Sequence, residues 1–110
     1  MKHLVLGTLL ASLAGAPAWA AGPDEAAFLV ESDAAMNRMM AATQVKPTGD
    51  VDKDFVAMMT PHHQAAIDMA QAVLRYGRNE QIRHLAQEII ATQQQEIVTM
   101  RKAVGEPLQQ

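Results

Sequence analysis

Residues 51–76 read VDKDFVAMMTPHHQAAIDMAQAVLRY, and this stretch decides the fold of the chain. Its apolar residues return every three or four positions, which is the period of an amphipathic α-helix. Asp50 or Asp52 suits its N-cap. Pro61 removes one backbone hydrogen bond in the middle of the stretch. The pattern therefore predicts either one helix kinked at Pro61, which we favour, or a new helix that starts there with Thr60 as its cap.

Two further helices are predicted, one on each side of this stretch in the sequence. The helical period holds over about 24–44, where Pro23 suits the first turn, and again from the cap Asn79 to about Val104. Gly77 ends the middle helix. No strand pattern of comparable strength is present, so the fold class is all-α, an antiparallel helical bundle of three helices. Three helices leave one apolar side incompletely covered, and we expect a homodimer to complete the bundle.

Each helix has a half that we expect to face the core. On the middle helix this inward half comprises Phe55, Val56, Met58, Met59, His62, His63, Ala66, Ile67, Met69, Ala70, Val73 and Leu74. Its outward half holds Asp54, Gln64, Asp68, Gln71 and Arg75. The first helix would turn inward Phe28, Leu29, Ser32, Ala35, Met36, Met39, Met40 and Thr43. The third would turn inward Ile82, Leu85, Ala86, Ile89, Gln93, Glu96, Ile97 and Met100.

The N-terminus has the pattern of a secretory signal peptide. Lys2 precedes a short apolar run from Leu4 to Gly15, and Ala18-Trp19-Ala20 supplies a small-residue cleavage site. We expect cleavage after Ala20, which leaves residues 21–110 as a single helical metal-binding domain. No later segment is apolar enough to cross a membrane, so we expect no stable membrane insertion after cleavage.

The composition of the mature chain excludes several classes of function. Removing Lys2 leaves 8 basic against 12 acidic residues, a balance of −4 that argues against nucleic-acid binding. Cysteine is absent, so no disulfide, thiolate nucleophile or thiolate metal site can form. No phosphate-binding glycine loop or nucleophile elbow is present, and neither is a Glu-x-x-His or His-Glu-x-x-His metal motif. We therefore expect no enzyme activity.

A cluster of soft ligands lies at the centre of the middle helix. Met58 and Met59 each precede a histidine by four residues, His62 and His63, so that one Met/His pair lies on each of two adjacent ridges. Thioether and imidazole together suit Cu(I) or Ag(I). A hydrogen-bonded polar layer within the core remains the structural alternative. Glu96 could in either case hold one imidazole N–H, as could Gln93 on the same helix, and leave the other ring nitrogen free.

The remaining methionines fit both a metal site and a core. Met36, Met39 and Met40 are spaced at i, i+3 and i+4, which is a core pattern as well as a clamp for a metal ion. Met69 lies two turns after His62, and Met100 belongs to the third helix. The candidate metal ligands are therefore His62, His63, Met58, Met59, Met69, Met36, Met39, Met40 and Met100, with Gln93 and Glu96 behind them. His84 is expected on the solvated face.

The chain also resembles a known family. The residues that carry the resemblance are Asp54-Phe55, Met58, Pro61-His62-His63-Gln64, Ala66-Ile67-Asp68-Met69-Ala70, Leu85-Ala86, Ile89-Ile90, Gln93, Glu96-Ile97 and Met100. They resemble the CopM-like family of exported, Met- and His-rich proteins with a ferritin-like helical domain. The resemblance implies a bacterial periplasmic bundle that binds copper or silver and supports metal tolerance, with His62, His63, Met58, Met59 and Met69 as the site. Thr60 departs from the family pattern, where an aliphatic residue is more usual.

These observations predict a periplasmic Cu(I)/Ag(I)-binding protein that sequesters or buffers metal in copper homeostasis or resistance. Two alternatives remain open. One is a structural or adaptor bundle whose Met-rich face contacts another protein. The other is a Zn(II) or Cu(II) site made from His62, His63 and Glu96.

Overall fold

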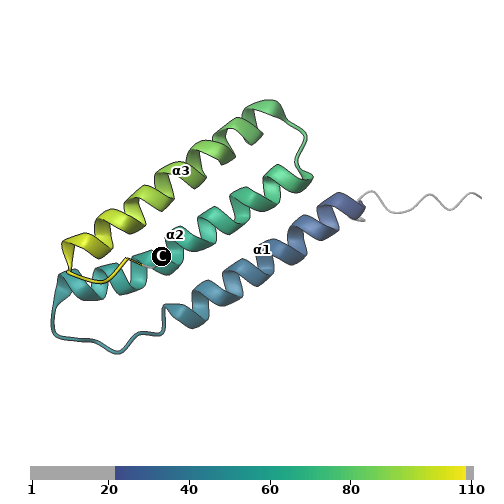
Figure 1. The fold of residues 1–110 in the computed structure, drawn as a ribbon. Helices are drawn as coiled ribbons and strands as arrows, with labels where there is room; N and C mark the ends of the chain where they lie inside the picture. The colour runs from purple at the N-terminus through teal and green to yellow at the C-terminus, as the bar shows by residue number, and fades with distance from the viewer. Residues whose placement is uncertain (1–21, 109–110) are drawn as a thin grey trace, which may run out of the picture.

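The structure, a computed structural model, describes residues 22–108, and this part of the chain holds three helices and no strand. Helix α1 spans Pro23–Ala42, α2 spans Val51–Tyr76 and α3 spans Glu80–Ala103. Successive helices run in opposite directions, as Figure 1 shows. The prediction of an all-α antiparallel bundle is confirmed. The signal peptide expected at residues 1–20 lies outside the described residues.

Side-chain caps fix where α2 and α3 begin. The carboxylate of Asp50 accepts hydrogen bonds from the backbone N–H groups of Asp52 and Lys53, at 3.0 and 3.1 Å. The side-chain oxygen of Asn79 accepts from Ile82 N–H at 3.0 Å. Helix α2 continues through Pro61 without a break, so the expectation of one continuous helix is confirmed. The helix ends differ from the expected ends by at most two residues.

The connection between α1 and α2 is tied to the start of α2. Gly49 has a φ of +87°, a conformation that side chains with a Cβ rarely adopt. Thr48, just before it, donates its hydroxyl to Asp54 Oδ1 at 2.6 Å. This bond holds the turn against the first helical turn of α2.

Helix α2 lies between the other two helices. Within the described residues α1 packs on one flank of α2 and α3 on the other, and α1 does not contact α3. Figure 1 shows the three helices side by side. The buried side chains are mostly small: Ser32, Ala35, Val56, Ala65, Ile67, Ala70, Ala72 and Ala86. The chain thus forms an open layer of helices with a thin core.

The outward half predicted for α2 is exposed at Gln64, Gln71 and Arg75, but part of this half also packs against α1. Asp68 accepts a hydrogen bond from Arg38 at 3.1 Å, and Arg75 forms an ion pair with Glu31. Ala72, on the same flank, is 0% exposed. Asp68 and Arg75 pair with residues of α1 across the contact, although Arg75 stays half exposed, so this charged side of α2 is also a packing surface.

The inward halves predicted for the three helices are also wrong at several positions. Several apolar side chains that we expected in the core are exposed, because α1 and α3 lie on opposite flanks of α2 and no described helix covers the side between them. These residues are Leu29, Met36 and Met40 of α1, Phe55 and Met58 of α2, and Ile82 and Leu85 of α3. We call this surface the open face. Separately, none of the helices described here is both long and apolar enough to cross a membrane.

Candidate metal centre

The two adjacent histidines of α2 have different surroundings. Neighbouring residues on an α-helix point about 100° apart, so His62 and His63 cannot share one environment. The side chain of His63 is turned toward α3 and is 13% exposed, whereas His62 is an exposed residue. His62 follows Met58 by one helical turn, which places it beside the open face.

Both ring nitrogens of His63 are engaged by oxygen atoms. Nδ1 donates to the backbone carbonyl of Met59 at 3.0 Å, and Nε2 lies 2.5 Å from the carboxylate of Glu96. A carbonyl only accepts, so Nδ1 carries a proton. Nε2 is in contact with the Glu96 carboxylate, so both ring nitrogens already have an oxygen partner. The expectation that Glu96 would leave the other nitrogen of His63 available is therefore wrong, because the Met59 carbonyl occupies it.

His62 differs because its ring makes no hydrogen bond with any described residue. A neutral imidazole in that state keeps one nitrogen lone pair for a metal ion. Met58 is 48% exposed one turn before it, and Met69 is half-buried two turns after it. Among the predicted ligands of α2, His62 and Met58 are thus exposed, and Met69 is half-buried.

Met58, His62 and Met69 follow one another along one side of α2, and we call this row the stripe. Two methionines of α1 lie beside it. The pairs Arg38–Asp68 and Glu31–Arg75 set an antiparallel register in which Met40 is level with Ala66 and Met36 with Ala70. Both methionines are exposed on the open face. Met36 and Met40 thus lie along the same surface as the stripe that carries His62.

The other predicted methionine ligands lie elsewhere. Met39 lines a cavity of about 110 Å³ between α1 and α2, together with Pro61. Met59 is half-buried and engages His63 through its carbonyl. Met100 lines a cavity of about 270 Å³ at the margin of the open face, beside Phe55. This geometry does not favour Met59 and His63 as a second pair of metal ligands.

Two residues of α3 were predicted to stand behind the histidines. Glu96 contacts His63 as described, whereas Gln93 forms no hydrogen bond with either histidine within residues 22–108. Over the same range no three His, Asp or Glu side chains gather closely enough to hold a metal ion. The alternative site made from His62, His63 and Glu96 is therefore not formed.

His84 is exposed on α3, as predicted. Its Nε2 lies 3.2 Å from Glu88, one turn further on. It is remote in sequence from the methionine-rich stripe and supplies a matched control for His62.

Sequence reasoning missed the polar contacts between α1 and α2. Three charged residues of α1 form ion pairs with charged residues of α2 or of the turn after it. The pairs are Asp24–Arg78, Glu31–Arg75 and Arg38–Asp68. A signal was available, because Glu31 and Arg38 are seven residues apart, as are Asp68 and Arg75. Their signs are complementary when the helices run antiparallel.

Glu31 is the centre of the strongest of these contacts. Arg75 donates to one of its carboxylate oxygens and Tyr76 donates to the other at 2.7 Å. The hydrogen bond from Arg75, followed by that from Tyr76, lowers the pKa of Glu31 below its ordinary value. The bond to Glu31 likewise raises the pKa of Tyr76. The Glu31 carboxylate is therefore bonded in its charged form to two residues at the end of α2.

The family described as a domain of unknown function, DUF305, matches residues 6–104. The chain belongs to the DUF305 family. This DUF305 chain is also 36% identical over 55 residues to a protein of Acanthamoeba polyphaga mimivirus that is described as uncharacterized. The matched stretch is 50% of this chain and 36% of the viral protein, so the chain spans well under two thirds of that relative.

Proposed function

We propose that this DUF305 chain is an exported Cu(I)- or Ag(I)-binding protein that sequesters or buffers the metal in the periplasm. The resemblance to the CopM-like proteins motivates the proposal. The observation that carries it is the exposed imidazole of His62, which has no hydrogen-bond partner within residues 22–108, one helical turn after the exposed thioether of Met58, in a chain without cysteine. Soft thioether ligands favour the reduced ion over Mg²⁺ or Ca²⁺. His62 adds an imidazole ligand when it is neutral.

The two histidines are expected to contribute unequally. His62 has a free ring, whereas His63 must first give up its bond to the Met59 carbonyl or to Glu96. Breaking a hydrogen bond at a partly buried site costs on the order of 1 kcal/mol or more, which weakens His63 as a ligand. In this proposal, His63 positions α2 against α3 and His62 holds the ion.

The test is a titration of the purified protein with Cu(I) or Ag(I) against a competing chelator. We expect His62→Ala to weaken binding by at least about tenfold, or ~1.4 kcal/mol. His63→Ala should have a smaller effect on affinity and a larger one on folding stability. His84→Ala is the matched control and should bind as the parent does. A parent protein that does not compete with the chelator, or a His62→Ala variant with unchanged affinity, would refute the proposal.

A second candidate function is an adaptor bundle whose Met-rich surface contacts another protein. The exposed apolar side chains of the open face favour it. The same titration separates the two candidates, because an adaptor without a metal role would leave the chelator's metal untouched.

A further inference from the structure

The open face is too apolar and too continuous for an ordinary helical surface. Its seven large residues come from all three helices: Leu29, Met36, Met40, Phe55, Met58, Ile82 and Leu85. Phe55 is 53% exposed and Ile82 is 51% exposed. Scattered apolar residues are normal on a protein surface, whereas a contiguous patch of several hundred Å² marks a contact site.

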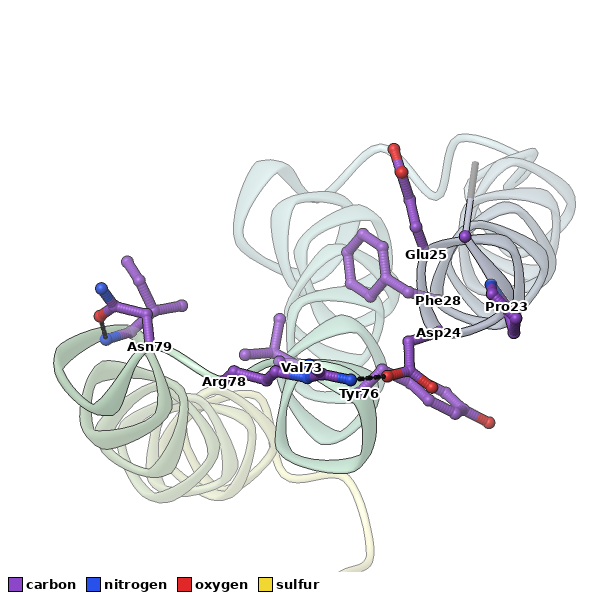
Figure 2. A pocket seen from close by; sticks show the side chains of 11 residues that line it. Pro23, Asp24, Glu25, Phe28, Val73, Tyr76, Arg78 and Asn79 are labelled. Atoms are coloured by element: carbon purple, nitrogen blue, oxygen red, sulfur yellow. Dashed lines mark hydrogen bonds and ion pairs between the residues drawn. The ribbon is translucent and has the colours of Figure 1, made fainter. Parts of the chain in front are cut away.

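The face is also hollowed at one end. A cavity of about 520 Å³ is lined by Phe28 of α1, Val73 of α2 and Ile82 of α3, among others. Figure 2 shows Phe28 reaching from α1 toward α2, with Val73 beneath the same space. At the rim, Arg78 donates to Asp24 at 2.9 Å. Such a hollow receives protruding side chains when two helical surfaces pack together.

The chain has little core of its own to compensate for this exposure. No large side chain is fully buried among the described residues, and five of the buried residues are alanines. A small domain depends on the apolar surface that it buries, so an exposed apolar face weakens it further. A partner that completes the core must be present whenever the chain folds, and a second copy of the same chain meets that condition.

The area and the charge of the face both suit such a partner. Seven side chains that are about half exposed present roughly 600 Å² of apolar surface, of the same order as the about 800 Å² that each partner buries in a standard interface. A two-fold axis places like against like, so unpaired charges would repel. Two bordering carboxylates are already paired within the chain, Asp24 with Arg78 and Glu96 with His63. Glu25, which also lines the hollow, is exposed at its rim and forms no ion pair within residues 22–108.

We propose that a second copy of this chain covers the open face in a two-fold dimer, and that the two copies of His62 share one bound metal ion. The first part stands on the apolar face alone. The second part rests on the proposed metal-binding function. His62 lies close to the middle of α2, which spans Val51–Tyr76. A two-fold axis that crosses this stripe near its centre brings the two His62 rings to either side of it, with Met58 or Met69 of each copy close by.

The dimer is tested by sedimentation of the purified protein. The parent is expected to sediment as a dimer, and Leu85→Glu as a monomer, because the substitution places a charge inside the proposed contact. Val30→Glu is the matched control: Val30 is an exposed apolar residue of α1 that points away from the open face. This variant should remain dimeric. A parent that is monomeric at every concentration would overturn the dimer.

Cross-linking locates the interface without relying on a destabilised variant. The chain contains no cysteine, so Ala66→Cys provides a single thiol in the middle of the α2 stripe. Gln71→Cys provides one on the exposed opposite side of α2. A short thiol-to-thiol cross-linker should join two chains through position 66 and not through position 71. Cross-linking through position 71 alone, or through neither position, would overturn the assignment of the face.

The shared ion is tested by Ag(I) titration of the same variants. Monomeric Leu85→Glu keeps His62 and Met58, yet it should lose affinity on the order of a hundredfold, because the second copy no longer contributes ligands. The parent should bind one ion per two chains. If monomeric Leu85→Glu binds as tightly as the parent, sharing is refuted while the metal function stands. If the parent is a dimer that binds no Ag(I), the metal function fails and the interface stands.

Discussion

The two faces of the helical layer differ in how completely their side chains are paired or covered. On the side of Glu31, Arg38, Asp68 and Arg75, charged residues of α1 and α2 pair with each other. On the open face, large apolar residues of all three helices are about half exposed. Polarity alone therefore does not identify which side of this small bundle faces solvent. Here the charged residues of α1 and α2 pair with each other, whereas no described helix covers the apolar surface.

The largest effect on the unfolding free energy is expected at the most tightly packed position between α1 and α2. Ala72 is 0% exposed between α1 and α2, so Ala72→Leu must separate the two helices. Overpacking of this kind costs about 1–3 kcal/mol of unfolding free energy. Chemical denaturation measures the loss. Gln71→Leu, at the exposed neighbouring position, should change stability by less than about 0.5 kcal/mol. Equal effects at the two positions would mean that the α1–α2 contact is not closed.

An intermediate effect, on Ag(I) affinity, is expected when a methionine on one or the other side of the layer is replaced. Met58 belongs to the open face, whereas Met39 lines the cavity between α1 and α2. Replacement by leucine conserves volume and removes only the sulfur ligand. Met58→Leu should weaken Ag(I) binding about tenfold, or ~1.4 kcal/mol, and Met39→Leu should leave it unchanged. Competition with a chelator measures both. A larger loss for Met39→Leu would move the metal site from the open face into the α1–α2 contact.

The smallest effect concerns acid pH and the charged residues of α1 and α2. The pKa of Glu31 is lowered in the folded chain, so its contribution to stability is complete above its ordinary range and is lost as the pH falls through the folded-state pKa. Glu31→Gln should remove a small part of the acid dependence of the unfolding free energy. Denaturation between about pH 3 and pH 7 measures it. Asp33→Asn, an exposed change on the same helix, should leave the dependence as in the parent. An unchanged dependence in Glu31→Gln would show that the pair with Arg75 does not form in solution.

The helices could be predicted from the sequence because their signals are local. Asp50 and Asn79 cap α2 and α3 through bonds to backbone N–H groups two or three residues away. The continuity of α2 through Pro61 followed from the unbroken apolar period on both sides of the proline. Such features depend on neighbouring residues alone, and the structure reproduces them within two residues at each end.

The packing faces could not be predicted in the same way because they depend on other helices. Asp68 was expected outside because it is charged. It is half-buried against α1, where Arg38 donates to one of its carboxylate oxygens and Gln64 of α2 donates to the other. The second bond of His63 goes to a backbone carbonyl, which every residue carries, so no sequence pattern reveals it. The exposure of Phe55 follows from the absence of a contact between α1 and α3. The composition of either helix does not disclose that absence.

The connectivity of the layer also bears on how the chain reaches its folded state. Every contact between described helices joins helices that follow each other in the sequence. Folds with such local connectivity have low contact order and form quickly, on the scale of microseconds to milliseconds. A chain synthesised or secreted with its amino end first can close the hairpin of α1 and α2 before α3 emerges. Helix α3 then adds to a template that already exists, and no loop has to wait for a distant part of the chain.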